Sequence, residues 1–296
     1  MVPRLDRCRD RLLGVPGEWD VMSCQQCGLT FTSPRVAESE LLHFYPSNYH
    51  VYQRDAPIRA NAVGALLRRL AMVPYTMRFG NPDWRVEPFG NRRFLDVGCG
   101  AGELLKRIGE AGWHCSGIDI SPTAVAAARR TVPTAAVEVG TLTTFKADSP
   151  FSLISLQHVL EHLPEPRESL ERCRALLQPG GLLVVGVPNI DSVEARVFGR
   201  GWIGLDIPRH LTHFTPSTLT RFVERSGFEV LRLRPAMFAS SLSESLALSL
   251  PGAAGRRLLG STFGRLLYFV SVFPASVSYL FGNAPVLEIL CRRKEL

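Results

Sequence analysis

Three glycines at alternate positions, Gly98, Gly100 and Gly102, mark the segment of the chain best suited to bind a ligand. They follow a short apolar run, 94–97, and lead into a helical pattern, which predicts a buried strand, a glycine loop and a helix. Such a loop lets a nucleotide-like ligand lie against bare backbone. A dinucleotide-binding loop places its third glycine one position later, where this chain has Glu103, so the spacing argues against a dinucleotide.

Two carboxylates beside this loop narrow the choice of ligand. Asp96 directly precedes the loop, where its charge repels a pyrophosphate and attracts the ammonium of an amino acid. Asp119 ends the next predicted strand, and a carboxylate at that place suits hydrogen bonds to two adjacent ribose hydroxyls. The apolar neighbour Ile120 can pack on an adenine ring. These residues favour a nucleoside that carries an amino acid, and S-adenosylmethionine has that chemistry.

Histidines at two places could remove a proton from a substrate. They are His158 and His162, which follow the predicted strand 151–157, and His210 and His213, which lie in the dense segment 201–214. Histidine changes its protonation state near neutral pH and is the most frequent general base in enzymes. We therefore expect the catalytic base among these four residues. The alternative for each of them is a structural position in the core or beside the ligand.

Two patterns bring potential metal ligands together, and we expect no metal at either of them. His158 and His162 could share a helix face, but two imidazoles without an identified third ligand do not define a site. The Cys24-Gln25-Gln26-Cys27 segment resembles one knuckle of a zinc ribbon. A thiolate zinc site needs about four ligands; Cys8 is a candidate third and no fourth is evident. A degenerate ribbon without zinc is the expectation, and zinc on Cys24 and Cys27 the alternative.

The elements that must position these residues alternate regularly from about residue 92. The expected strands are 92–97, 114–119, 135–139, 151–157, 182–187, 228–233 and 286–291. The expected helices are 102–111, 122–130, 166–177 and 216–226. Strands and helices that alternate at these lengths predict an α/β domain with a parallel sheet covered on both faces.

The glycine loop, Asp119, the Pro179-Gly180-Gly181 turn and the stretch 157–162 together make residues 90–235 resemble a class I S-adenosylmethionine-dependent methyltransferase of small-molecule type. This resemblance implies a Rossmann-like, seven-stranded, mostly parallel sheet with helices on both faces and an antiparallel last strand. The implied organisation is an N-terminal extension with a zinc-ribbon-like remnant and substrate-side helices (1–90), a cofactor-binding core (91–239), a helical insertion (240–282), and a last core strand with a basic tail (283–296).

The resemblance also assigns the cofactor, S-adenosylmethionine, to particular residues. The implied cofactor-binding residues are Asp96, Gly98, Cys99, Gly100, Asp119, Ile120, Thr141, Leu142 and Gln157. Thr141 and Leu142 stand where the family caps the adenine, although this chain has no aspartate there for the adenine amino group. Gln157 is expected near the methionine portion. The implied reaction is an in-line displacement at a sulfonium carbon, in which the protein aligns the nucleophile and removes its proton.

The residues after strand 151–157 bear on the methyl acceptor. Methyltransferases that act on nucleic-acid or protein amides often carry Asn-Pro-Pro-Tyr there, whereas this chain has Leu156-Gln157-His158-Val159. We therefore expect O-methylation of a small molecule, namely a sugar, a glycan, a lipid-linked sugar or a secondary metabolite, with a histidine base. A C-methyltransferase and a non-catalytic cofactor-binding or partner-binding protein are the alternatives. Glu103 and Asp96 disfavour a nicotinamide oxidoreductase.

Composition sets the remaining expectations. With 296 residues and 46% apolar content the chain can bury a large core. The net charge of +7 comes almost entirely from scattered arginines, so we expect no nucleic-acid partner. Seven cysteines, several of them in apolar segments, indicate reduced thiols and a cytoplasmic location. The insertion 240–282 is expected to pack on the domain or in a homodimer, with contact to a membrane surface as the alternative.

Overall fold

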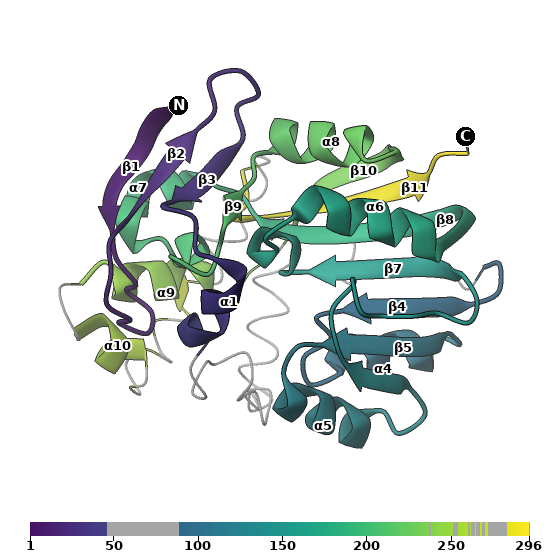
Figure 1. The fold of residues 1–296 in the computed structure, drawn as a ribbon. Helices are drawn as coiled ribbons and strands as arrows, with labels where there is room; N and C mark the ends of the chain where they lie inside the picture. The colour runs from purple at the N-terminus through teal and green to yellow at the C-terminus, as the bar shows by residue number, and fades with distance from the viewer. Residues whose placement is uncertain are drawn as a thin grey trace.

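The computed structural model describes residues 1–45, 89–236, 240–250, 254–259 and 283–295, and single positions from 238 to 271. The substrate-side helices expected in the N-terminal extension fall largely on 46–88, outside this range, as does much of the expected insertion. The described residues form a seven-stranded sheet and a four-stranded sheet that lie beside each other (Figure 1).

The seven-stranded sheet has the order β10-β11-β8-β7-β4-β5-β6. Its strands are β4 (Arg93–Val97), β5 (His114–Asp119), β6 (Ala136–Val139), β7 (Phe151–Gln157), β8 (Leu177–Pro188), β10 (Phe228–Ala236) and β11 (Val286–Arg293). The pairs β4–β5, β5–β6, β4–β7 and β7–β8 are parallel, and β11 is antiparallel to both of its neighbours. The expected Rossmann-like sheet with an antiparallel last strand is confirmed.

Helices connect these strands as the sequence predicted. They are α4 (Glu103–Glu110), α5 (Pro122–Thr131), α6 (Pro166–Leu176) and α8 (Pro216–Arg225). Local signals fix two of the starts: the Ser121 side chain accepts from the Ala124 amide at 3.2 Å, and Thr215 forms a capping box with Thr218. Successive residues of β4 point to opposite faces of the sheet, since Phe94 and Leu95 belong to two separate buried clusters. The sheet is therefore buried on both faces.

The N-terminal part of the chain is more regular than the sequence indicated. Strands β1 (Val2–Cys8), β2 (Trp19–Ser23) and β3 (Thr30–Ser33) form an antiparallel sheet, and β9 (Thr212–His213) joins it beside β3. Because β9 belongs to the histidine-containing segment 201–214, the N-terminal sheet directly supports that segment (Figure 1).

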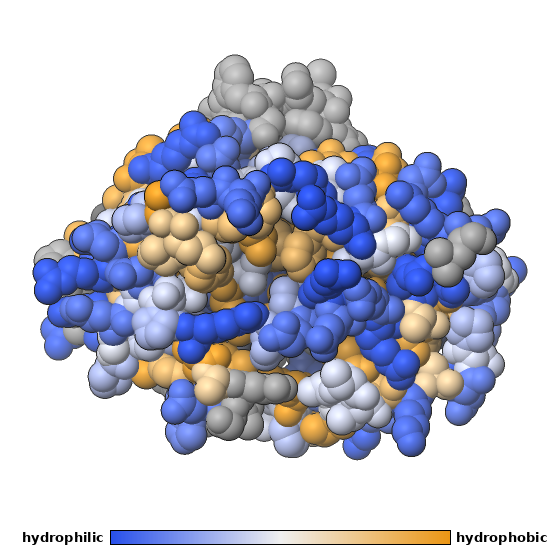
Figure 2. Space-filling view, turned by 45° about the horizontal axis from the view of Figure 1, so that its top comes forward, coloured by the Kyte–Doolittle hydropathy of each residue, from blue (hydrophilic) through white to orange (hydrophobic). Residues whose placement is uncertain are grey.

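Short helices complete the described chain. They are α1 (Glu38–Leu41), η1 (Leu42–Phe44), η3 (Leu160–His162), α7 (Val193–Phe198), η4 (Gly199–Gly201), η5 (Ile203–Leu205), α9 (Ser241–Leu248) and α10 (Ala254–Leu259). Within the described positions, no helix is long and apolar enough to cross a membrane. One face of the molecule shows apolar residues in small patches between hydrophilic ones (Figure 2).

Candidate active site

The glycine loop follows β4 at the carboxyl edge of the sheet, between β5 and β7. Open α/β sheets bind ligands at this edge, where neighbouring crossovers diverge. Gly98 and Gly100 have φ angles of 68° and 52°, in the left-handed region that favours glycine. A Cβ atom on Gly98 would lie 2.5 Å from Cγ2 of Val159, so the loop packs directly against the segment that follows β7.

Asp119, at the end of β5, is held in place by the loop. Its Oδ2 accepts from the Gly100 amide at 2.9 Å, and its Oδ1 accepts from the Ser121 amide at 2.8 Å. Burial raises the pKa of this carboxyl, and the two amide donors oppose that rise. Each oxygen keeps a lone pair for a further donor. The side chain of Ile120 is exposed and offers an apolar surface beside the carboxylate.

Two polar groups at the same edge suit the amino-acid portion of the cofactor. Asp96 is 3% exposed, and burial raises the pKa of its carboxyl to about 8, so a cation placed against it would restore its charge. Nε2 of Gln157, at the end of β7, is buried and has no hydrogen-bond partner among the described residues. A carboxylate for an ammonium, an amide donor for a carboxylate and an apolar side chain for adenine therefore fit S-adenosylmethionine.

The remaining predicted cofactor residues differ in accessibility. Thr141 is exposed, and its hydroxyl lies 2.7 Å from that of Thr143. Leu142 is 4% exposed and packs in the core, so its side chain presents little surface to an adenine. Cys99 is also buried, and burial raises the pKa of its thiol, which keeps it a neutral packing group.

His158 is the most accessible of the four predicted histidines. It directly follows β7 and has a φ angle of 56°, a conformation uncommon outside glycine and one that recurs at functional sites. Its side chain is 44% exposed, and its Nδ1 lies 3.5 Å from Oε1 of the buried Glu161. A half-exposed imidazole against a buried carboxylate is the arrangement of an oriented general base.

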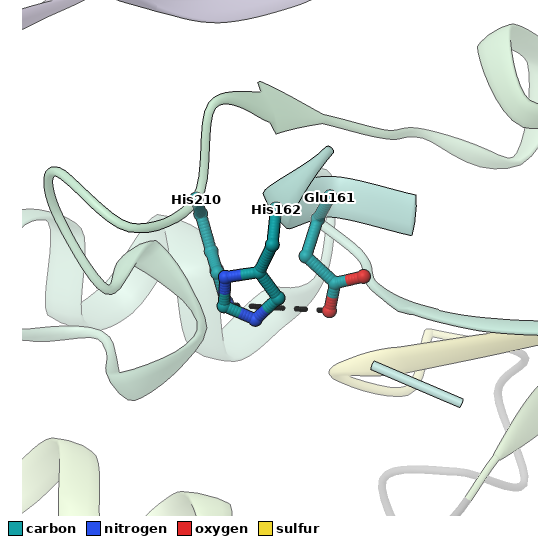
Figure 3. A group of neighbouring side chains, drawn as sticks. All are labelled: Glu161, His162 and His210. Carbon is teal, nitrogen blue, oxygen red and sulfur yellow. Dashed lines mark ion pairs between the residues drawn. The ribbon is translucent and has the colours of Figure 1, made fainter. Parts of the chain in front are cut away.

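His162 and His210 lie beside Glu161, the residue that His158 also contacts. The two imidazole rings are 4.5 Å apart between centroids and meet edge to face, with the Glu161 carboxylate beside them (Figure 3). Burial, followed by the nearby His210, lowers the pKa of His162 to about 4, so this ring is neutral at pH 7. Burial alone raises the pKa of Glu161, but the three neighbouring imidazoles outweigh it and hold that pKa below its ordinary value.

A fully buried arginine, Arg209, fixes this region. It forms two hydrogen bonds of 2.9 Å to the carboxylate of Asp10 and two more, of 3.0 and 2.6 Å, to Asp206. Burial raises the pKa of Asp206, but Arg209 outweighs it and holds that pKa at about 2, so the pair stays charged. The Arg209 carbonyl lies 3.1 Å from Nδ1 of His162. Asp10 and Arg209, which nothing in the local sequence singled out, therefore position the histidine cluster.

His213 and the cysteines lie in different surroundings. Nε2 of His213 is 3.1 Å from the Thr32 hydroxyl, and burial lowers the pKa of the ring to about 3. These are the surroundings of a structural side chain, and acceptor contact by His213 stays a prediction. Cys24 and Cys27 follow β2, and no third ligand groups with them in the described part of the chain. Cys8 is buried, and burial raises the pKa of its thiol to about 11.

Comparisons with known proteins identify the family of the chain. The family model described as "Methyltransferase domain" matches residues 62–233. A ubiquinone biosynthesis O-methyltransferase of Aromatoleum aromaticum is 29% identical over 165 residues, covering 51% of this chain and 70% of that protein. Another, of Cereibacter sphaeroides, is 29% identical over 174 residues, covering 55% of this chain and 70% of that protein.

A solved structure supports the fold. It is the 1,6-didemethyltoxoflavin-N1-methyltransferase of Burkholderia thailandensis, which aligns with a TM-score of 0.50 and 14% identity over 95% of this chain and 98% of that chain. The family model covers more than half of the sequence and includes the glycine loop, Asp119 and Glu161. The chain therefore belongs to the methyltransferase-domain family and is an S-adenosylmethionine-dependent methyltransferase.

Proposed function

We propose that this methyltransferase O-methylates a small-molecule acceptor and that His158 removes the proton from the acceptor hydroxyl. The observation that carries the proposal is the pairing of the half-exposed His158 with the buried Glu161 across 3.5 Å. The carboxylate favours the tautomer with its proton on Nδ1, which leaves Nε2 free to accept a proton. Because His158 directly follows β7 and Val159 packs against the glycine loop, the base lies beside the donor site.

The donor site divides the cofactor among the residues of the loop and the neighbouring strand ends. Asp119 would bind the ribose hydroxyls, Ile120 the adenine, and Asp96 and Gln157 the amino-acid portion. When bound, S-adenosylmethionine supplies an activated methyl group on a sulfonium. The protein then has to align the acceptor oxygen and take its proton, and His158 performs the second task.

The acceptor class rests on the curated relatives and on the absence of an Asn-Pro-Pro-Tyr segment. Those relatives are named for O-methylation in ubiquinone biosynthesis. We propose a small-molecule acceptor that carries a hydroxyl group. The candidates are an intermediate of ubiquinone biosynthesis, a free or lipid-linked sugar or glycan, and a secondary metabolite.

The test is methyl transfer from isotope-labelled S-adenosylmethionine to a panel of these acceptors, with the product bond identified by NMR. A methyl group on oxygen is expected, and one on carbon would overturn the proposal in favour of C-methylation. His158→Gln should lower kcat at least about 100-fold, as for loss of a general base, with unchanged S-adenosylhomocysteine affinity. His114→Gln, at an exposed histidine on β5, is the matched control. An unchanged kcat in His158→Gln would refute the base assignment.

A further inference from the structure

Three potential ligand atoms converge between η3 and the loop that precedes β9. Glu161, His162 and His210 each offer one such atom, and all three atoms lie within 4.8 Å of one another. Nε2 of His210 lies 4.0 Å from Oε1 of Glu161. Figure 3 shows the Glu161 carboxylate beside the His162 ring, with the His210 side chain behind that ring. Two distant segments of the chain thus bring three ligating groups together.

The hydrogen bonds of the two rings leave their inward-facing nitrogens as acceptors. Nδ1 of His210 lies 2.9 Å from the Gly204 carbonyl, whereas Nδ1 of His162 lies 3.1 Å from the Arg209 carbonyl and 2.9 Å from the Tyr45 hydroxyl. A carbonyl oxygen can only accept, so the neutral His210 ring carries its proton on Nδ1 and a lone pair on Nε2. The Arg209 carbonyl favours the same tautomer of His162, with the Tyr45 oxygen as a second acceptor. Backbone carbonyls orient metal-binding histidines in this way, which fixes the tautomer and the ring.

Glu161 adds a buried carboxylate whose close ionisable neighbours are imidazoles. Its side chain is 1% exposed, Nδ1 of His158 lies 3.5 Å from its Oε1, and within the described ranges neither carboxylate oxygen accepts a hydrogen bond of ordinary geometry. Buried carboxylates are costly unless they are paired, hydrogen-bonded or bound to a metal. A carboxylate and two imidazole lone pairs that face one another call for a cation at their centre.

We propose that Glu161, His162 and His210 bind one divalent transition-metal ion, with zinc as the ion that suits the donor set best. Two imidazoles and one carboxylate form a known zinc donor set, whereas magnesium prefers oxygen ligands. Three protein ligands leave a fourth position for an oxygen of water or of a bound molecule. Zinc–ligand bonds of about 2.0–2.1 Å place tetrahedral ligands about 3.4 Å apart, so binding needs small side-chain shifts.

In the competing arrangement no metal is bound, and the imidazoles alone face the Glu161 carboxylate. Only the metal-bound arrangement retains a metal after purification or binds one with a defined stoichiometry. Metal binding can be measured without any methyl acceptor. Its outcome is therefore separate from the outcome of the O-methylation test.

The experiment uses the full chain stripped with a chelator and titrated with Zn²⁺, with Co²⁺ as a spectroscopic substitute and with Mg²⁺ as a hard-ion comparison. We expect one equivalent of Zn²⁺ to bind and Co²⁺ to give visible bands without a thiolate charge-transfer band. Glu161→Gln and His210→Gln should each weaken Zn²⁺ binding at least about tenfold, since even outer groups of metal sites contribute 10–100-fold. Circular dichroism and S-adenosylhomocysteine affinity establish that each variant is folded.

Two controls separate this site from other ligands of the chain. His114→Gln removes an exposed histidine from another strand, and it should leave Zn²⁺ affinity unchanged. A Cys24→Ser/Cys27→Ser double variant removes the zinc-ribbon-like knuckle and should also leave the equivalent bound at Glu161 in place. The proposal is overturned if folded protein binds no stoichiometric Zn²⁺, if binding survives both Glu161→Gln and His210→Gln, or if the cysteine variant abolishes it.

Discussion

The two halves of the site are built in different ways. On the donor side, Asp96, Gly98, Gly100 and Asp119 lie within 24 residues of sequence, and backbone amides set their geometry. On the histidine side, the residues come from η3, from the loop before β9 and, through Arg209, from Asp10 near the N-terminus. The donor side is a local structure of one strand–loop–helix unit. The histidine side exists only when distant segments have come together.

This difference shows what each half depends on. Backbone geometry persists as long as its glycines and the β4–β5 pairing persist. The histidine side depends on a buried ion pair, and the removal of one partner of such a pair is strongly destabilising. Substitutions far from the cofactor should therefore damage the histidine side more than the donor side.

The largest effect is expected from breaking the long-range pair. Asp10→Asn removes one of the two carboxylates that contact the fully buried Arg209 and replaces a hydrogen-bond acceptor by an amide donor. It should cost about 3 kcal/mol of unfolding free energy, the upper range for a lost hydrogen bond to a charged group. Urea unfolding measures this loss. Asp6→Asn, at an exposed ion pair with Arg200, is the matched control and should leave the midpoint unchanged. Equal unfolding midpoints for the Asp10 variant and the wild type would show that the Asp10–Arg209 ion pair does not stabilise the fold.

A smaller effect is expected at the ribose position of the donor side. Asp119→Ala should weaken S-adenosylhomocysteine binding by about 1–3 kcal/mol, because hydrogen bonds to a partly buried ligand are lost. Calorimetry gives the affinity, and Asp148→Ala, at an exposed aspartate outside the site, is the control. Unchanged affinity in Asp119→Ala would exclude ribose binding at this carboxylate.

The pH dependence of cofactor binding tests Asp96. Burial raises the pKa of this carboxyl to about 8, so the ligand-free protein holds it mostly protonated at pH 6. A bound ammonium favours the ionised form, so ligand binding should release a proton from Asp96. The affinity should therefore rise by up to about tenfold for each pH unit as the pH increases toward 8. The same raised pKa means that the ligand-free protein loses stability as the pH rises from the ordinary carboxyl pKa of about 4 to about 8.

Calorimetry of S-adenosylhomocysteine binding in two buffers of different ionisation enthalpy counts the released protons. Asp96→Asn should remove the release, because an amide has no proton to lose in this pH range. Proton release that persists in Asp96→Asn would assign the titration to another group.

The smallest effect is expected at the adenine position. Ile120→Ala removes an exposed apolar surface, which should weaken S-adenosylhomocysteine binding by roughly 1 kcal/mol and leave the unfolding midpoint unchanged. Val139→Ala, at another exposed apolar residue, serves as the control in the same binding assay. An equal loss in both variants would show that Ile120 has no special contact with adenine.

The sequence predicted the strands and helices around the donor half well because their signals are local. Strands 114–119 and 151–157 have the expected bounds, and α5 begins at Pro122, as expected for the helix 122–130. One strand, β8, begins at Leu177 rather than at residue 182. There the Gln178-Pro179-Gly180-Gly181 segment, which reads as a turn, continues the strand.

The histidine half was only partly predictable. Residue type alone makes His158, His162 and His210 candidates, but no pattern in the sequence assigns a function to Glu161 or Asp10. The pairing of Arg209 with Asp10 spans 199 residues of sequence, and a single sequence carries no local pattern for such a contact. The N-terminal sheet was missed for the same reason, because β3 is paired on one side by β9 from the other end of the domain.

The contact between Gly98 and Val159 limits how the enzyme can be re-engineered. Because a Cβ on Gly98 would lie 2.5 Å from a valine methyl group, the donor loop and the segment that carries the base share one steric boundary. Valine is branched at Cβ and has little freedom to move aside. A chimaera that takes its donor loop from another methyltransferase must therefore exchange residues 97–102 and 157–162 as one module, even though more than fifty residues separate them in the chain.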